Sequence, residues 1–171
     1  SNQVMSFRRA SYCTDKDGVR QHANGITSFV DGSMVYGSTD KVSHKLRAYS
    51  GGKLKTSAGD MAPMADDVDL TSHMAMCLPG RPCYAYGDTR GNENVVLSAL
   101  HTVWVREHNR LASMFAQQNP WWDDELLFQT ARKWTIAEVQ AITYYEWLPL
   151  LIGDTCPALA KSTGYNPNVK P

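Results

Sequence analysis

The chain has 171 residues, enough for one domain with a sizeable core, and 43% hydrophobic with 20% charged residues is typical of a globular protein. Lys plus Arg and Asp plus Glu both number 17, so the formal charge is zero and we expect no surface for nucleic acid. No apolar stretch is long enough to span a bilayer and the first residues do not resemble a signal peptide, so we also expect no membrane span.

The first 39 residues contain no long helical or strand pattern. Residues 1–24 are polar and basic without clear periodicity, and we predict a loop there. Residues 26–39 mix β-branched and aromatic residues with Asp, Ser and Gly. We therefore predict a structured loop followed by a turn.

Residues 40–50 suit a short helix, because Val42, Leu46 and Tyr49 recur at helical spacing. The next segment, 51–88, is rich in Gly, Pro, Met and Asp and has no run long enough for a helix or strand. An irregular segment of this length in a compact domain is usually functional or held in place by other contacts.

Four cysteines occur, at positions 13, 77, 83 and 156. Cys77 and Cys83 bracket a tight Pro/Gly loop, CLPGRPC, which favours a local disulfide and hence an oxidising compartment. Two buried thiols are the alternative. A zinc site is disfavoured, because no second Cys/His pair with ligand spacing follows.

Two longer helices are predicted in the second half of the chain. The first runs from Glu93 to Phe115, and its apolar stripe consists of Leu97, Leu100, Trp104, Leu111 and Phe115. The sequence NPWWDD interrupts it, and Asp123 or Asp124 can cap the next helix.

That second helix covers residues 125–148, and Pro149 marks its end. Its apolar surface consists of Leu127, Ala131, Trp134, Ala141, Tyr145 and Leu148. The tail, 161–171, is polar and rich in turn residues. The chain is therefore predicted to be mainly α with long loops.

Three long motifs stand out along the chain: ITSFVDGSMVYGS, then GDTRGNE with LHTVWVREHNRLA, and finally ARKWTIAEVQAITYYEWLPLLIG. They lie within residues 26–38, 87–115 and 131–153. In the same order, they closely resemble three blocks of the animal haem peroxidase family. The resemblance implies that family's fold, mainly α with helices joined by long ordered loops and little β structure.

The resemblance gives roles to Arg90 and Glu93, which spacing alone would describe as an exposed pair at a helix start. Arg90 matches the family's distal catalytic arginine, which stabilises the charge that develops as bound hydrogen peroxide splits. A guanidinium suits this role, because it stays charged and donates in a fixed fork. Glu93 matches the glutamate that forms an ester with a haem methyl group. On one helix turn, side chains three residues apart would face the same cofactor.

The segment TSFVDGS matches the family's calcium loop. Thr27, Phe29, Asp31 and Ser33 alternate, so an extended chain would present their oxygens to one side: two hydroxyls, a carboxylate and the backbone carbonyl of Phe29. Hard oxygen donors suit Ca²⁺. Without the resemblance, DGS would indicate only a turn, and the family completes the site with an Asp from another segment.

Neither histidine of the first long helix, His101 or His108, falls at a position that ligates iron in the family, so we expect both to serve packing and hydrogen bonding. The family's distal and proximal histidine segments are not included in residues 1–171. We therefore expect the chain to be the central part of a single haem peroxidase domain. It would need the remaining chain or segments for activity, whether as a processed subunit, as part of a longer chain or, less favoured, as a natural truncation.

The implied function is that of an oxidoreductase that uses haem and hydrogen peroxide to oxidise a small electron donor, which can be a halide, a phenol or a tyrosyl group. Secretion or a secretory granule is the implied location. One alternative is a non-catalytic, peroxidase-like extracellular scaffold, which would have no need of Arg90 and Glu93. The other is a relative of the fatty-acid dioxygenases, against which Glu93 argues mildly, because ester-linked haem belongs to the peroxidase branch.

Overall fold

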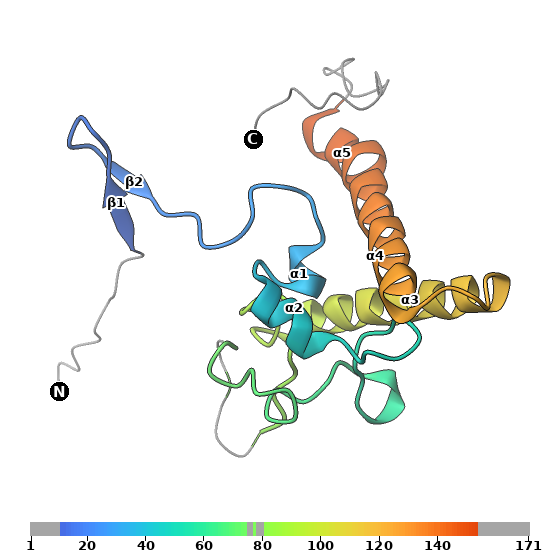
Figure 1. The fold of residues 1–171 in the computed structure, drawn as a ribbon. Helices are drawn as coiled ribbons and strands as arrows, with labels where there is room; N and C mark the ends of the chain where they lie inside the picture. The colour runs from blue at the N-terminus through green and yellow to red at the C-terminus, as the bar shows by residue number, and fades with distance from the viewer. Residues whose placement is uncertain (1–10, 75–76, 78–80, 154–171) are drawn as a thin grey trace.

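The computed structural model describes residues 11–74, 77 and 81–153 (Figure 1). Helices dominate, as predicted, and the predicted tail at 161–171 and Cys156 lie outside the described residues. In chain order the elements are β1 (Tyr12–Thr14), β2 (Arg20–His22), α1 (Ser33–Tyr36), α2 (Asp40–Leu46), the 3₁₀-helix η1 (Ala58–Asp60), α3 (Val95–Gln118), α4 (Asp124–Ala141), the π-helix η2 (Ile142–Trp147) and α5 (Leu148–Ile152).

Strands β1 and β2 form an antiparallel hairpin that stands away from the helices (Figure 1), so the prediction of a loop over residues 1–24 is wrong at this point. The turn is made by Asp15, whose carboxylate accepts the backbone N–H groups of Asp17 and Val19 at 3.0 and 2.9 Å. Gly18 supplies the left-handed conformation with φ of 79°. Both strands are fully exposed, so they lack the alternation of polar and apolar residues by which strands are recognised.

The helix predicted over residues 40–50 is confirmed as α2, but it ends at Leu46 and leaves Tyr49 outside. Thr39 caps it by accepting the backbone N–H of Val42. Just upstream, Ser33–Tyr36, within the predicted loop and turn over 26–39, form the single helical turn α1.

Apart from the short 3₁₀-helix η1, the described residues between 51 and 88 are irregular, as predicted, yet they supply much of the core. Their buried side chains are Leu54, Ala62, Ala65, Val68, Leu70, Met74, Cys83, Ala85 and Tyr86. Two stretches run antiparallel without forming a sheet: the N–H of Ala65 donates to the carbonyl of Cys83 at 2.8 Å, and that of Ala85 donates to Pro63 at 2.7 Å. Contacts with other parts of the chain, and not regular secondary structure, therefore hold this segment.

Helices α3 and α4 cross and pack together (Figure 1), and Asp123 caps α4 as predicted by accepting the N–H of Leu126 at 2.8 Å. The predicted apolar stripe of α3 is partly wrong, since Leu100 is exposed. The buried face consists of His101, Thr102, Val105, His108, Leu111, Ala112 and Phe115. On α4, Leu127 and Ala131 are buried, but Trp134 is exposed.

Pro149 does not end the second long helix, contrary to the prediction, because the helical path continues through η2 and α5 to Ile152. The π-helix η2 ends at Trp147, and Pro149 lies in the first turn of α5, where a residue without an N–H is tolerated. The helix ends where Gly153 adopts φ of 70° and donates its N–H to the carbonyl of Pro149.

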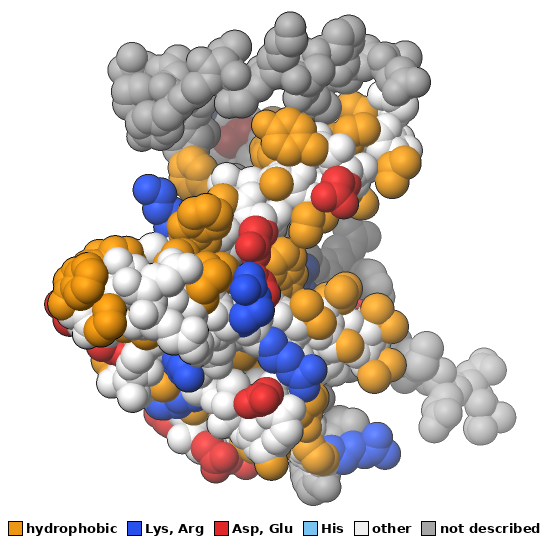
Figure 2. Space-filling view, turned by 90° about the vertical axis from the view of Figure 1, so that its right-hand side faces the viewer, with side chains coloured by type: hydrophobic (Ala, Val, Ile, Leu, Met, Phe, Trp, Pro, Cys, Tyr) orange, Lys and Arg blue, Asp and Glu red, His pale blue; other side chains and the backbone are white. Residues whose placement is uncertain are grey.

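Two stretches of helix expose large apolar side chains. One is the beginning of α3, with Val95, Val96, Leu100 and Val103. The other is the end of the α4–α5 path, with Tyr145, Trp147, Leu150 and Leu151, which lies in the upper part of the molecule in Figure 2. Among the described residues, no helix combines the length and the apolar character needed to cross a membrane.

Candidate functional site

Arg90 and Glu93 lie in a turn that precedes α3, so the prediction that they share the helix's first turn is wrong. The backbone N–H of Glu93 donates to the carbonyl of Arg90 at 2.8 Å, which closes the turn. The helix starts only at Val95, because the side chain of Asn94 accepts the N–H of Leu97 at 2.9 Å and caps it. The two predicted site residues are still brought together, but by the turn and not by a helix face.

Two glycines pack this turn tightly against the core. A Cβ atom on Gly87 would lie 2.2 Å from the carbonyl oxygen of Ser33 and 2.2 Å from the backbone nitrogen of Gly37. On Gly91 it would lie 2.2 Å from Cδ2 of Tyr86. Only glycine fits at either position without displacing the backbone or a buried ring.

Asp88 holds the guanidinium of Arg90. Its two carboxylate oxygens accept Nε at 2.9 Å and Nη2 at 2.7 Å, and Oδ1 also accepts the backbone N–H of Arg90 at 2.8 Å. The Asp88 side chain is only 13% exposed, whereas that of Arg90 is 61% exposed. Hydrogen bonding from Arg90 lowers the pKa of Asp88, and burial offsets part of that effect. The pair therefore presents a fixed, charged guanidinium at the surface.

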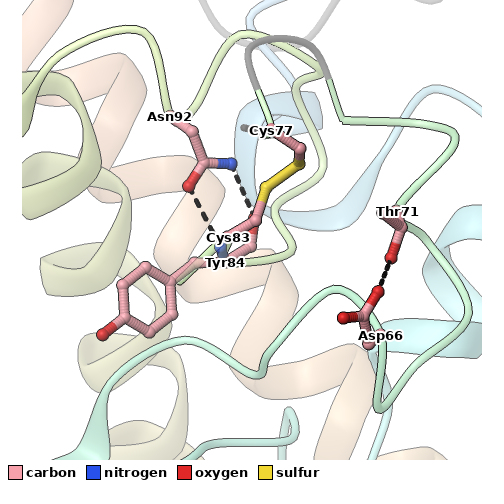
Figure 3. The surroundings of a disulfide bond; sticks show 6 residues. All are labelled: Asp66, Thr71, Cys77, Cys83, Tyr84 and Asn92. Atoms are coloured by element: carbon pink, nitrogen blue, oxygen red, sulfur yellow. Dashed lines mark hydrogen bonds between the residues drawn. A yellow bond between two sulfur atoms is a disulfide. The ribbon is translucent and has the colours of Figure 1, made fainter. Parts of the chain in front are cut away.

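Glu93 is exposed while its backbone is held on both sides, by Asn94 at the start of α3 and by Asn92 in the turn. Figure 3 shows the carboxamide of Asn92 bonded to both backbone groups of Tyr84, at 3.0 Å to N–H and 2.8 Å to C=O. An open cavity of about 460 Å³ is lined in part by Glu93. Its apolar lining comes from Met61, Pro82, Tyr84, Val95 and Ala99.

The chemistry at this surface suits one edge of a large, flat group that is apolar with charged substituents. Val95, which follows the turn, is 81% exposed, and Val96 is 66% exposed. The cavity that Glu93 and Val95 line thus combines apolar contact with a carboxylate, and Arg90 adds a guanidinium from the same turn. Haem has both features, so these residues fit one part of a haem site.

Asp88 and Asn92, which hold this turn, are not among the residues predicted from the sequence. An Asp two residues before an Arg is a local signal that could have identified the first. Nothing local marks the second, since Tyr84 is eight residues away and its backbone offers no sequence pattern.

The predicted calcium residues are partly brought together. The carboxylate Oδ1 of Asp31 accepts the hydroxyl of Thr27 at 3.0 Å and the backbone N–H of Ser33 at 3.0 Å. Phe29 is exposed, so its backbone carbonyl is the group it offers. Carboxylate, hydroxyl and carbonyl oxygens are of the kind that fits Ca²⁺, which takes six to eight of them, so a calcium ion here would need further ligands.

Both histidines of α3 are buried in the core, as expected. His108 is fully buried, with Nδ1 at 2.8 Å from the hydroxyl of Tyr36 and Nε2 at 2.9 Å from the carbonyl of Gly52. Because that carbonyl only accepts, Nε2 carries the proton and Nδ1 accepts from Tyr36. Within the part of the chain that the structure describes, no three His, Cys, Asp or Glu residues cluster as metal ligands.

The predicted disulfide between Cys77 and Cys83 is confirmed, with Cα atoms 5.5 Å apart. It closes the loop directly upstream of Tyr84 (Figure 3), whereas Cys13 lies exposed on β1. The disulfide is therefore adjacent to Tyr84, the residue whose backbone Asn92 binds.

The whole chain, residues 1–171, matches the model of the family described as animal haem peroxidase. Peroxinectin A of Dictyostelium discoideum is 38% identical over 159 residues, which are 91% of this chain but 29% of that protein. In structure, the chain resembles peroxidase A of the same organism, with a TM-score of 0.68 and 36% identity over 80% of this chain and 28% of the other.

A fatty acid alpha-dioxygenase of Oryza sativa, solved with palmitic acid, shares the fold at a TM-score of 0.61 and 26% identity, over 81% of this chain and 21% of the dioxygenase. The chain therefore spans less than a third of the relatives it matches. With its three motifs in family order and the family model matched throughout, the chain belongs to the animal haem peroxidase family.

Proposed function

We propose that the protein containing this chain is a haem-dependent peroxidase that uses hydrogen peroxide to oxidise halide, phenolic or tyrosyl donors. The observation that carries the proposal is the turn before α3, which presents Arg90 and Glu93 from one rigid segment beside exposed valines. Apolar side chains that are exposed together commonly mark a surface that binds a ligand or a partner. A flat cofactor bound there would explain why Arg90, Glu93 and the exposed valines occur on one segment.

In this proposal Glu93 holds the haem through an ester between a carboxylate oxygen and a methyl carbon of the porphyrin. Forming that bond would remove one proton and two electrons from the methyl group. Hydrogen peroxide would take up these two electrons, that proton and one further proton from solvent, and so become two molecules of water. The bound haem supplies the redox chemistry with peroxide, and the protein supplies attachment and electrostatics.

Arg90 would stabilise negative charge as the O–O bond of peroxide breaks. Asp88 occupies Nε and one hydrogen of Nη2, and so fixes the plane of the guanidinium without using all five of its N–H groups. A donor that is already oriented needs no reorganisation as charge develops, which is the basis of electrostatic stabilisation in enzymes.

Thr27, Phe29, Asp31 and Ser33 would bind Ca²⁺ together with ligands from outside this chain. The loop that carries them ends at α1, whose backbone contacts the Gly87 turn. A calcium ion here would therefore rigidify the support of Arg90 rather than take part in the reaction.

Residues 1–171 would form the central part of one peroxidase domain. The remaining segments or chains would cover Leu100 and Val103 of α3 and the apolar end of the α4–α5 path, where large apolar side chains are exposed. The Cys77–Cys83 bridge supports a location outside the reducing cytosol, either secreted or in a secretory granule.

The test is an assay of the natural full-length protein, purified with its haem. The proposal expects peroxide-dependent oxidation of guaiacol or bromide and no turnover of palmitic acid with oxygen. The dioxygenase alternative rests on the structural likeness to the rice enzyme and expects the reverse. Protein without haem and without either activity would favour the scaffold instead.

A further inference from the structure

Asn92 makes an unusual pair of bonds for a residue in a surface turn. Its carboxamide oxygen accepts the N–H of Tyr84, and its carboxamide nitrogen donates to the C=O of the same residue (Figure 3). The side chain thereby takes the place of a neighbouring strand and satisfies both backbone groups of Tyr84 on that side. Few side chains have the donor and the acceptor that this requires.

Tyr84 is itself anchored. It follows Cys83 of the disulfide directly, and its backbone also pairs with Met64 in an isolated antiparallel bridge. Through Asn92, the turn is therefore fastened to a segment that a covalent bond and a backbone pair hold in place. Glu93 is the next residue along the chain.

The Glu93 backbone is thus restrained on both sides, by Asn92 and by the Asn94 cap, while its carboxylate stays exposed. A glutamate that served only as a solvated surface charge would gain nothing from such restraint. A carboxylate that must meet one carbon atom of a rigid ring would gain much, because reaction requires the two atoms within van der Waals distance in one orientation.

We propose that Asn92 is the positioning residue for Glu93, fixing its backbone against Tyr84 so that the carboxylate is presented where the haem ester forms. This inference rests on the proposed function. The competing explanation is that Asn92 stabilises the fold and has no particular relation to Glu93.

The chain contains a matched control for that explanation. Asn109, in the middle of α3, makes the same pair of bonds with the backbone of Leu54, at 2.8 Å from N–H and 3.0 Å to C=O. It lies sixteen residues further along the chain than Glu93, outside the turn. Removing either carboxamide leaves two backbone groups without these partners, so both changes should weaken the fold in a similar way.

The experiment uses the natural full-length protein loaded with haem and treated with equal amounts of hydrogen peroxide. Denaturing mass spectrometry gives the fraction of the Glu93 peptide that carries haem, and thermal unfolding gives the midpoint of each variant. For Asn92→Ala we expect the modified fraction to fall about tenfold, as for a reactive group released from its orientation. For Asn109→Ala we expect the wild-type fraction with a similar drop in midpoint.

Asn92→Asp keeps the acceptor for the Tyr84 N–H but places a carboxylate oxygen against the Tyr84 carbonyl, so it should also lower the modified fraction. It replaces the alanine variant if that one does not fold. A wild-type fraction in either Asn92 variant would overturn the inference, and so would an equal loss in Asn109→Ala. If the wild-type Glu93 peptide carries no haem, the proposed attachment fails, and the inference fails with it.

Discussion

The backbone of Gly87 lies directly against the carbonyl of Ser33, so close that a Cβ atom on Gly87 would be 2.2 Å from that oxygen. The next residue strengthens the contact, because the N–H of Asp88 donates to the carbonyl of Met34 at 3.2 Å. The loop that carries Asp31 and the turn that carries Arg90 are therefore one packed unit. Whatever orders the loop also orders the support of the guanidinium.

Replacing Gly87 by Ala should separate these two segments. The added methyl group meets backbone atoms on α1 that cannot rotate away, so we expect the free energy of unfolding to fall by about 2–3 kcal/mol. Chemical denaturation measures the change. Gly25→Ala is the control, since a Cβ there meets nothing within 4 Å. Equal midpoints for the two variants would contradict the tight packing.

Replacing Arg90 by Leu should slow the reaction of the haem-loaded protein with hydrogen peroxide by about 10²–10³-fold, the usual cost of losing one oriented donor to a developing charge. Stopped-flow absorbance of the haem gives the rate. Arg110→Leu removes another exposed arginine, paired with Glu107 on α3, and should leave the rate unchanged. A wild-type rate for Arg90→Leu would exclude the catalytic role.

The sequence predicts a site at Arg90 and Glu93 only through the family resemblance of the motifs around them, because their spacing alone indicates an exposed pair at a helix start. The cap at Asp123 follows from a local rule. The turn itself was mistaken for helix, because the Asn94 cap shortens an apolar pattern that fits a helix equally well one turn earlier.

Long-range partners were beyond the reach of sequence patterns. Asn92 reaches back to Tyr84, and His108 bonds Tyr36 and Gly52, which are 72 and 56 residues distant. Each of these pairs forms only once the two chain segments that carry it have packed together. Local rules also do not predict that the helical path continues past Pro149, since the π-helix that precedes it has no sequence signal of its own.

Calcium should stabilise the full-length protein through Asp31. We expect chelation to lower the free energy of unfolding of the wild type by about 3 kcal/mol, as for a ligand present at a few hundred times its Kd. Asp31→Asn weakens a carboxylate ligand and should be much less sensitive to the chelator. Asp17→Asn, on the distant hairpin, should respond as the wild type does. An identical response of all three proteins would argue against calcium in this loop.

Acid should destabilise the fold through His108. Burial lowers its pKa to about 4, and the charges of Arg47 and Arg132 act in the same direction. Between pH 6.5 and pH 4 the unfolded chain binds a proton that the folded chain does not, so stability is lost as pH falls through this range. A shift of this size corresponds to about 3 kcal/mol.

Urea unfolding at a series of pH values measures this loss. His108→Gln can keep a donor toward Gly52 but cannot be protonated, so its stability should fall less steeply between pH 6.5 and 4, whatever its stability at neutral pH. Parallel curves for wild type and variant would show that another group causes the acid sensitivity.

The most direct test of the account is denaturing mass spectrometry of the full-length protein, because an ester survives unfolding whereas haem held only by contacts is released. We predict a haem-sized mass increment on the peptide that contains Glu93, absent from Glu93→Gln and retained in Glu146→Gln, a change at an exposed glutamate of η2. An unmodified Glu93 peptide from protein that has turned over peroxide would contradict the attachment on which the proposed site is built.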